Sequence, residues 1–594
     1  MLYPKLNKIK TARQWTEQFL GLDRRPRTYD GTFDAMGNMT GEPWPLLSSR
    51  KKRGLVAELD SPQAMAALGK LAWIDGSTLY FNGQATAIND LSLDADMLPK
   101  RITAMGAYLL IMPDKRYYNT VDPEDRGGIE RLWASRGSVT FTLCDMDGID
   151  YPLGETFLGD RDPLSLANET PGEGDYWLNT GEYPHALYRL YDGKWVSVSS
   201  TYVKISGAGI GEGLNVQDGV RISGIEYSGN DAAFGEQLEF LNQTHIIQAV
   251  ADDFIVITGV IDYRYTQTNG KVRADRRMPQ MDYLIECNNR LWGCRFGEQD
   301  GETVNRIYAC ALGDFKNWEK YMGTSMDSYY VNVGSDGPFT GAAVHRGYPH
   351  FFKTDCVHKV YGDKPSNFQT QLTECVGVKQ GCSGSLAAYN GGLYYVSVNG
   401  VEYFESLTEN RSKALGLEGV EAAAAGQAGG RYYLSVKCRD GQWDLYVLDL
   451  ERGVWHRQDD SHALSFTELN GEMYMLLANG LLYALNGTEG EEEPEDVTWY
   501  AETAVMGYEY PDHKYLSRFL LRMRLGAKAE CRVYVQYDSD GLWLFKGTIR
   551  GEDRVKTYLL PVIPRRCEHL KVRFEGHGFM QLYGMARELA IGRE

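Results

Sequence analysis

The sequence lacks the features that define several large classes of protein. None of its 594 residues belongs to an apolar run of the ~18 residues that a membrane-spanning helix needs. The N-terminus, Met1-Leu2-Tyr3-Pro4-Lys5, has no apolar signal segment. We therefore expect no membrane span, and we expect synthesis and folding in the cytoplasm.

Two further shortages narrow the possible functions. The ten cysteines include no Cys-x-x-Cys pair, and most lie in apolar strand-like stretches, which favours buried free thiols over a zinc site or a disulfide framework. Basic residues are outnumbered, with 62 Lys and Arg against 80 Asp and Glu and a net charge of −18. A sequence-specific DNA-binding protein usually carries a basic stripe. This chain as a whole would repel a polyanion, which is compatible with a surface past which DNA slides without adhering.

The composition favours an all-β protein. There are 39 Tyr, 12 Trp and 65 Gly, and hydrophobic residues make up 43% of the chain. Aromatic residues favour strands, and glycine is frequent in the turns between them. The hydrophobic fraction is also large enough for an extensive core.

A short sequence motif recurs between residues 284 and 487: a polar turn, an aromatic or aliphatic strand, another turn and another strand. Three consecutive intervals between copies are each roughly 40 residues, the length of a four-stranded propeller blade. Because one blade cannot bury both of its faces, the repeats must pack around a common axis, and we predict a β-propeller. The copies are Asn289–Cys294, His350–Lys353, Gly392–Ser397, Arg431–Ser435 and Glu472–Leu476.

Changes in period and composition divide the chain further. The predicted fold is an all-β propeller with an inserted small β-domain and a C-terminal β-sandwich. The sandwich is predicted because apolar and polar residues alternate along its strands, which leaves one face of each strand exposed to solvent. The predicted segments are an extended N-terminal arm (1–54), first propeller strands (55–122), an inserted β-rich domain (123–280), the remaining blades (281–488), an acidic linker (489–497) and the sandwich (498–594).

The N-terminal arm shows little regular periodicity, apart from a short helix that we expect within residues 10–20. Its basic residues cluster at Arg24, Arg25 and Arg27 and again over 50–53. A solvated or partner-facing arm is the simpler interpretation, because the aromatic residues expected between the basic residues of a nucleic-acid patch are few.

The inserted domain contains the only residues that we single out as a candidate binding site, Trp177 and Trp195. Their surroundings resemble the small aromatic-rich β modules of phage tail proteins and chitin-binding modules, and exposed rings there would stack on sugars. The alternative is that both tryptophans form the core of a module too small to have another.

No motif in the sequence indicates catalysis, a metal or a cofactor. The glycine-rich segment 207–213 has the wrong spacing for a dinucleotide site, and no helix pattern follows it. Asp-Gly-x-Trp occurs three times, at 192–195, 440–443 and 540–543, and a type I′ turn above a packed tryptophan explains all three. A propeller glycosidase needs paired carboxylates at its axis, and nothing places such a pair there. We predict that the protein is not an enzyme.

Several short sequence segments resemble those of a family of bacteriophage virion proteins, and together they are distributed over most of the chain. They are Gly21–Arg24, Phe33–Thr40, Pro45–Leu47, Arg50–Gly54, Asn289–Cys294, Leu312–Trp318, Phe352–Gly362, Pro365–Phe368, Pro564–Leu570 and Phe574–Gly578. The family is similar in layout to the tail nozzle, or packaged-DNA stabilisation, proteins of short-tailed phages.

The resemblance implies a structural tail protein in the virion, assembled in the host cytoplasm as a homo-hexamer below the portal and adaptor. Double-stranded DNA would pass through the ring and be retained by it. It implies no catalytic residues. The alternative is a tail protein that binds glycans on the host surface through the Trp177/Trp195 module or the sandwich.

Overall fold

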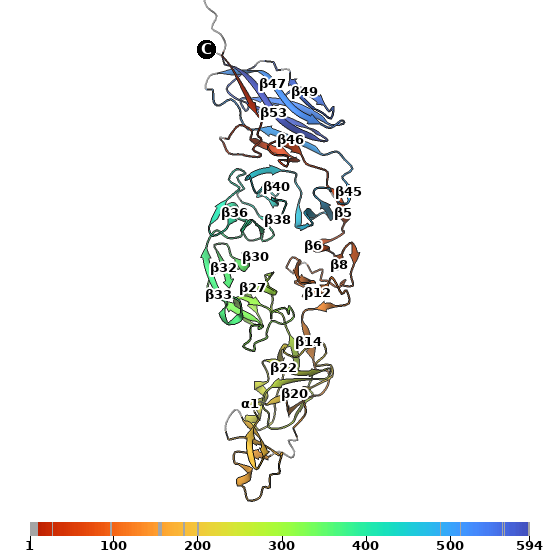
Figure 1. Ribbon diagram of the computed structural model, residues 1–594, viewed down its shortest axis with the longest axis vertical. Coiled ribbons are helices and arrows are strands. Elements are labelled where there is room, and N and C mark those ends of the chain that lie inside the picture. The colour runs from red at the N-terminus through yellow and green to blue at the C-terminus, as the bar shows by residue number, and fades with distance from the viewer. Residues whose placement is uncertain are drawn as a thin grey trace, which may run out of the picture. The chain divides into compact units, whose positions relative to one another are not determined.

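The computed structural model describes residues 10–591, except for 27, 95–97, 152–156, 182–184, 199–200, 418, 488, 511–512, 561 and 564. In the part of the chain that it describes, strands are joined by turns and there is one α-helix, α1 (Ala232–Phe240). Figure 1 shows the strands gathered into many small sheets. The predicted all-β class is confirmed.

Outside the inserted domain, six sheets of the described chain each consist of four strands that follow one another along the chain, as in propeller blades. Their strands are β6 (Pro62–Leu68), β7 (Lys70–Asp75), β8 (Thr78–Phe81) and β9 (Gln84–Ala85); β10 (Arg101–Met105), β11 (Tyr108–Met112), β12 (Arg116–Asn119) and β13 (Arg126–Gly128); β26 (Tyr283–Cys287), β27 (Arg290–Gln299), β28 (Glu302–Ala309) and β29 (Tyr329–Asn332); β30 (Gly341–His345), β31 (Tyr348–Phe352), β32 (Cys356–Tyr361) and β33 (Gln369–Glu374); β34 (Ala387–Tyr389), β35 (Gly392–Ser397), β36 (Gly400–Phe404) and β37 (Thr408–Asn410); and β38 (Ala422–Ala428), β39 (Arg431–Lys437), β40 (Trp443–Asp449) and β41 (Val454–Arg457).

A seventh blade takes its fourth strand from the N-terminal side of the first. It contains β42 (Ala463–Leu469), β43 (Glu472–Leu477) and β44 (Leu481–Ala484), and β44 pairs with β5 (Gly54–Glu58). The short β45 (Glu491–Glu492) pairs with the other edge of β5. A side chain at Gly54 would meet the carbonyl oxygen of Glu489 at 1.7 Å, so only glycine permits this approach. The protein is a β-propeller, as predicted.

The five copies of the recurring sequence motif become the second strands of five blades, β27, β31, β35, β39 and β43. Strands β35 and β43 are buried at every position, as befits strands covered by neighbouring blades on both faces. The turns before them are Asn390-Gly391 and Asn470-Gly471, all four residues with positive φ. That is the type I′ geometry that suits a right-twisted hairpin.

The chain divides into two compact units. The first comprises Met1–Ile102, Gly337–Lys359 and Thr370–Glu594, and the second Thr103–Asp336 with Val360–Gln369. In the first unit, the leading strands of successive blades pack together, β30 on β34, β34 on β38, β38 on β42 and β42 on β6. In the second, the blades of β10–β13 and β26–β29 share one hydrophobic cluster around Leu110, Leu291 and Trp318.

The inserted domain lies between β13 and β26, close to the predicted boundaries, and forms two sheets. One has the order β14-β25-β21-β22-β23-β20-β15-β24 and the other the order β16-β17-β18-β19. Their strands are β14 (Arg131–Ala134), β15 (Val139–Cys144), β16 (Phe157–Gly159), β17 (Tyr176–Asn179), β18 (Ala186–Tyr191), β19 (Lys194–Ser197), β20 (Tyr202–Ser206), β21 (Gly219–Ser223), β22 (Thr244–Ala251), β23 (Phe254–Thr258), β24 (Tyr265–Gln267) and β25 (Arg273–Arg276). Leu178 and Leu187 of the smaller sheet join the core of the larger one.

The C-terminal domain has two sheets, as a sandwich requires, and its strands alternate buried and more exposed residues as predicted. One sheet has the order β3-β4-β53-β47-β50, with β1 on β53 and β51 on β47, and the other the order β2-β46-β52-β48-β49. The strands are β1 (Lys10–Thr16), β2 (Phe33–Gly37), β3 (Met39–Thr40), β4 (Leu47–Ser49), β46 (Thr498–Thr503), β47 (Lys514–Leu525), β48 (Glu530–Tyr537), β49 (Leu544–Arg550), β50 (Val555–Leu560), β51 (Arg566–Cys567), β52 (Leu570–His577) and β53 (Met580–Ile591).

The N-terminal segment is therefore neither a free arm nor helical over 10–20. Strand β1 pairs with β53 and β2 with β46, so red N-terminal strands run among the blue C-terminal ones in Figure 1. The burial of Phe19, Leu22 and Phe33 in the sandwich core explains the difference. Apolar burial in a sheet outweighs the weak helix preference of a short segment.

Buried histidines couple the stability of this fold to pH. Burial lowers the pKa of His350, His358 and His456 to about 4. Because each folded-state pKa lies below the ordinary value of 6.5, the unfolded chain takes up these protons first as the pH falls. The contribution of these histidines to the free energy of unfolding therefore decreases as the pH falls from 6.5 to about 4.

We expect the free energy of unfolding to fall as the pH is lowered from 6.5 toward 4. In the His456→Gln variant this fall should be shallower by up to ~1.4 kcal/mol per pH unit, because one linked proton is removed. Urea unfolding followed by tryptophan fluorescence at several pH values measures the slope. The matched control is the same substitution at the exposed His577. Equal slopes for His456→Gln and the wild type would contradict the assignment.

Candidate functional site

The structure brings the two predicted glycan-binding tryptophans together on one face of the small sheet β16–β19. The ring centroids of Trp177 and Trp195 are 5.7 Å apart, and Tyr188 stacks on Trp177 at 5.2 Å. Trp177 is only 8% exposed, whereas Trp195 is half-buried. Their indole N–H groups donate to the Gly159 carbonyl oxygen at 3.0 Å and to Asp162 Oδ1 at 2.7 Å.

This arrangement favours the structural role for Trp177. A ring that stacks on a sugar needs an open face, and Trp177 has none of useful size. Trp195 retains a partly open face, and Tyr191 on the neighbouring strand is 71% exposed. Tyr191 lies on the opposite face of this sheet, since Leu190 rather than Tyr191 faces Trp195 in the register.

The Asp-Gly-x-Trp turns differ from the prediction at two of three places. Asp192 and Gly193 both have positive φ, as a type I′ turn requires. At 440–443 and 540–543 only the glycines, Gly441 and Gly541, have positive φ, so these turns are of another type. Trp443 stacks on His462 with the ring centroids 3.7 Å apart.

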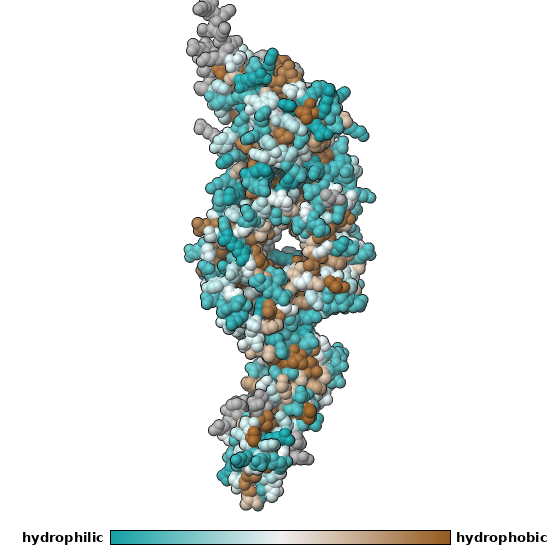
Figure 2. Space-filling model, in the orientation of Figure 1, coloured by the Kyte–Doolittle hydropathy of each residue, from teal (hydrophilic) through white to brown (hydrophobic). Residues whose placement is uncertain are grey.

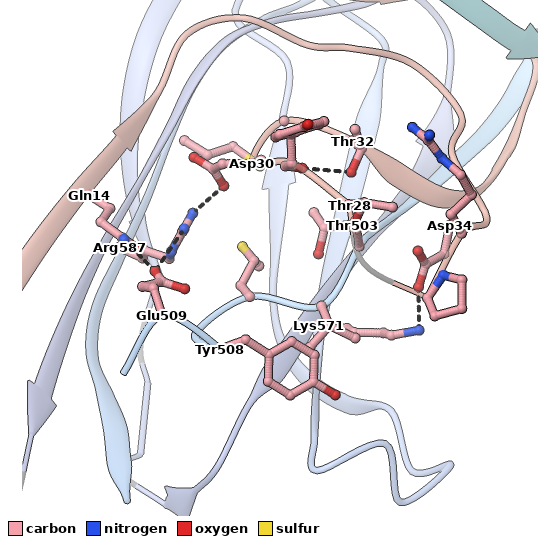
Figure 3. Close-up of a pocket in the computed structure, with 18 of the residues that line it drawn as sticks. Gln14, Thr28, Asp30, Thr32, Asp34, Thr503, Tyr508, Glu509, Lys571 and Arg587 are labelled. Atoms are coloured by element: carbon pink, nitrogen blue, oxygen red, sulfur yellow. Dashed lines mark hydrogen bonds and ion pairs between the residues drawn. The ribbon is translucent and has the colours of Figure 1, made fainter. Parts of the chain in front are cut away.

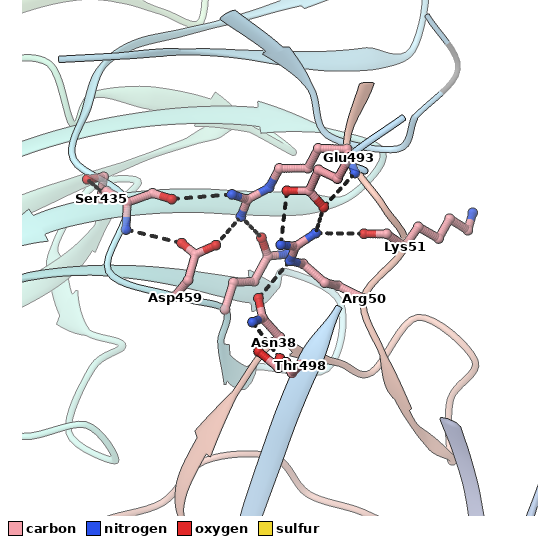
Figure 4. A network of polar contacts seen from close by, with 10 residues as sticks. Asn38, Arg50, Lys51, Ser435, Asp459, Glu493 and Thr498 are labelled. Atoms are coloured by element: carbon pink, nitrogen blue, oxygen red, sulfur yellow. Dashed lines mark hydrogen bonds and ion pairs between the residues drawn. The ribbon is translucent and has the colours of Figure 1, made fainter. Parts of the chain in front are cut away.

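The basic cluster over 50–53 lies in a network with acidic residues of the linker and of the propeller (Figure 4). Arg53 is 3% exposed and bonds Asp459 at 2.7 Å and Gln458 at 2.9 Å. Arg50 pairs with Glu493 at 2.7 Å and donates to Asn38 at 2.7 Å. The prediction of a solvated arm or a nucleic-acid patch is therefore wrong for Arg50 and Arg53, whose guanidinium groups are committed within the chain.

Electrostatics hold this network in its charged form. Burial by itself would raise the pKa of Asp459, but Arg53, a hydrogen bond from Ser461 and Arg50 together lower it below the ordinary value. Burial lowers the pKa of Arg50, against the pull of Glu493. The network joins a blade, the strand β5 segment and the sandwich, because Asn38 also donates to the Thr498 carbonyl oxygen at 2.7 Å.

We call the network around Arg53 a polar joint, because it holds two parts of the chain together through charged groups. A second polar joint, within the second unit, holds the inserted domain to the propeller. Asp218 and Arg276 form a buried ion pair at 2.7 Å, and Asn317, beyond β28, donates to Asp218 at 2.9 Å. Gly219 N donates to Asn317 at 3.0 Å, and a side chain at Gly219 would meet the Glu319 carbonyl oxygen at 2.2 Å.

A cavity of about 230 Å³ adjoins this joint. Charged side chains of both signs line it, among them Arg221, Arg277, Asp300 and Glu319. Burial raises the pKa of Glu319, whose closest partner is the Thr244 hydroxyl at 3.3 Å.

A larger cavity, of about 1160 Å³, opens between the two sheets of the sandwich at the edge where β1 and β2 lie (Figure 3). Met506 and Met585 form an apolar floor. Arg587, itself 4% exposed, pairs with Asp30 at 2.8 Å and lies 3.7 Å from Glu509. At the other side of the cavity, Lys571 pairs with Asp34.

Over the described ranges, no three His, Cys, Asp or Glu side chains lie close enough together to hold a metal ion. No helix in those ranges has the length and hydropathy to cross a membrane. None of the ten cysteines, all of which lie in the described residues, forms a disulfide, and eight are buried, as predicted.

No protein-family model and no curated protein matches the sequence. Among solved structures, BamB from Moraxella catarrhalis matches at 12% identity and a TM-score of 0.29, covering 77% of this chain and 100% of that one. PorZ of Porphyromonas gingivalis matches at 12% and 0.24, over 89% and 71%. An exo-β-1,3-galactanase from Phanerochaete chrysosporium matches at 9% and 0.20, over 51% and 94%. Similarity this low carries no argument about activity.

Sequence reasoning missed the charged network, although a signal for it was present. A basic run at 50–53 and an acidic run at 489–496 are complementary, and their pairing could have been proposed from charge alone. The sequence contains no comparable signal for the joint at Asp218 or for the cavity beside β1. Each is built from residues more than 50 positions apart, and no two complementary charge runs point to their contact.

We expect Arg53→Met to lower the free energy of unfolding by ~3–5 kcal/mol, because it leaves Asp459 buried without its counter-charge. Lys51→Met, which removes the same charge from the surface next to it, should change stability by no more than ~0.5 kcal/mol. Chemical denaturation of both variants measures the difference. Similar losses in the two variants would show that the buried pair contributes little.

Proposed function

We propose that the protein is a structural component of a bacteriophage tail, a nozzle or hub subunit that assembles into a ring through which DNA passes and is retained. The observation that carries the proposal is the withdrawal of Arg50 and Arg53 from solvent into ion pairs with Glu493 and Asp459. A chain with a net charge of −18 thereby loses two of its most clustered cations as sites for phosphate.

The physical argument concerns friction between protein and DNA. Non-specific DNA binding comes from Lys and Arg groups that displace counterions from phosphates, so each cation sequestered inside the protein lowers it. On the face shown in Figure 2, hydrophilic residues predominate and hydrophobic ones lie scattered among them. An acidic, hydrophilic wall would let DNA move without adhering.

The family resemblance supports the partners that we propose. They are further copies of the chain, in a homo-hexamer, together with the portal, the adaptor and other tail proteins, in the virion tail. The two buried polar joints support a rigid wall element, since both fix an added domain to the propeller through charged groups that cannot be exposed cheaply. We assign no catalytic residues, and the glycosidase-like neighbours do not alter that assignment.

The ring is tested with the purified full-length chain. We expect negative-stain images to show six-fold rings with a central channel. Fluorescence anisotropy at physiological salt should show double-stranded DNA binding no tighter than the weak end of the non-specific range, ~10⁻⁴ M. A compact monomer at every concentration, or tight binding of DNA, would contradict the proposal.

A second candidate function is recognition of host-surface glycans by the inserted domain. The specific observation in its favour is the partly open face of Trp195, whose ring lies beside Phe157 and Trp177. Stacking on such rings is a common way for proteins to hold sugars.

If the inserted domain binds glycans through this face, Trp195→Ala should abolish co-sedimentation of the chain with host cell walls. Tyr191→Ala should leave it unchanged, because that ring lies on the opposite face. Circular dichroism verifies that both variants fold. No co-sedimentation of the wild type, or equal retention of the Trp195→Ala variant, would exclude this candidate.

A further inference from the structure

One sheet of the sandwich ends in an unpaired strand on both sides. In the described part of the chain, β1 pairs only with β53, and β50 pairs only with β47. Along its outer edge, each of these two strands has no strand partner among the described residues. Such edges attract further strands, and soluble proteins normally cover or interrupt them.

The space beside β1 is also unfilled. The cavity of about 1160 Å³ reaches Gln14 on β1, and Figure 3 shows Gln14, Arg587 and Glu509 grouped at one side of it. Two buried polar atoms there, Gln14 Oε1 and Arg587 Nε, have no hydrogen-bond partner. Other buried atoms in the described residues share this state, such as Arg53 Nε and Arg276 Nε, but here a large open volume lies beside the two atoms, and a partner that fills it could satisfy them.

The missing partner has the chemistry of a strand. The cavity exceeds the ~300–1,000 Å³ usual for a small-molecule site. Its buried lining residues Met506 and Met585 suit an apolar side chain. Charged groups of both signs surround them: Asp30 and Glu509 are partly exposed beside Arg587, and Arg24, Arg25 and Lys571 also line the cavity.

Strand β50 supplies such side chains. Lys556 and Tyr558 face the interior of the sandwich, because they lie opposite the buried Met523 and Leu521 of β47. The Lys556 side chain is 40% exposed and pairs with Glu552 at 2.7 Å, so in the proposed contact it would exchange one exposed carboxylate for others. On the other face of the strand, Val555 is 41% and Leu559 62% exposed, although both are apolar.

The direction of the strands is compatible with a continuous sheet. Strands β1, β53, β47 and β50 are antiparallel in that order. If the sheet of one copy continues into the next, β50 of the first meets β1 of the second in antiparallel orientation, as with every other pair in this sheet. The two strands are also similar in length, at six and seven residues.

We propose that β50 of one copy of the chain adds to the edge of β1 in a second copy, with Lys556 and Tyr558 entering the cavity between the sheets. This contact rests on the proposed ring and identifies the surface that holds it together. Lys556 would face Asp30 and Glu509, and Tyr558 would cover Met506 and Met585. Because the two edges are different surfaces, the contact is head-to-tail, and such contacts build rings when the rotation closes.

Cross-linking tests the contact directly. Arg13→Cys on β1 and Thr557→Cys on β50 both change exposed positions on the outer face of the sheet. A short bis-maleimide should give covalent dimers when the two full-length variants are mixed and not when either is treated alone. The unsubstituted chain is the control for its ten native cysteines, of which eight are buried. Dimers in each variant alone would indicate a symmetric contact and overturn the proposal.

Charge reversal tests the chemistry of the contact. Lys556→Glu should weaken self-association at least ~10-fold, measured by mass photometry across a concentration series, because it sets a carboxylate against Asp30 and Glu509. Lys528→Glu, at an exposed site in a turn of the same domain, makes the same charge change and should leave association unaltered.

The outcomes separate this contact from the ring itself. Rings that persist in Lys556→Glu, with no cross-link in the mixture, would overturn the contact and leave the ring standing. Cross-linked open filaments without rings would support the contact and overturn the proposed nozzle. A wild-type chain that stays monomeric would overturn both.

Discussion

The return of the N-terminal segment to the C-terminal half of the chain is the constraint on which the first compact unit depends. Residues 33–58 supply an edge strand to one sheet of the sandwich, a pair of short strands to the other and the fourth strand of the last blade. All three are pairings between residues more than 400 positions apart. Their large closure entropy is offset only when the whole segment docks together.

Charge makes that docking specific. Apolar strands alone can slip in register, since a pleated edge accepts many partners of similar pattern. The Arg53–Asp459 ion pair permits only one register of the N-terminal segment against the propeller, because a shift of the segment would leave a desolvated charge without its partner. The same logic holds at the inserted domain, where Asp218 and Arg276 are buried together and Asn317 closes the network. In both places a polar joint supplies the register that hydrophobic packing leaves undefined.

The sequence predicted those parts of the fold that rest on local patterns. The blade repeat was visible because each second strand is buried on both faces and each preceding turn needs residues that tolerate positive φ, as at Asn390-Gly391. The sandwich was visible from alternation along β47 and β52. The role of residues 10–58 was not, because β1 and β2 gain their stability from strands at the other end of the chain. Trp177 shows the same limit for the site: its composition fitted a sugar platform, and only its 8% exposure assigns it to the core.

A partner is expected to bind where groups of the protein are not already paired or packed within the chain. The charges of Arg53 and of Asp218 are paired within the chain, so a partner at either joint would have to break an existing ion pair. The sheet edge at β1 is different, because a large cavity lies beside a strand whose outer edge has no strand partner among the described residues. A β-sandwich whose layers were complete would close this gap with its own side chains, as its core does around Phe519 and Phe574. An interior left open beside an open edge is therefore the expected signature of a domain that is completed by another subunit.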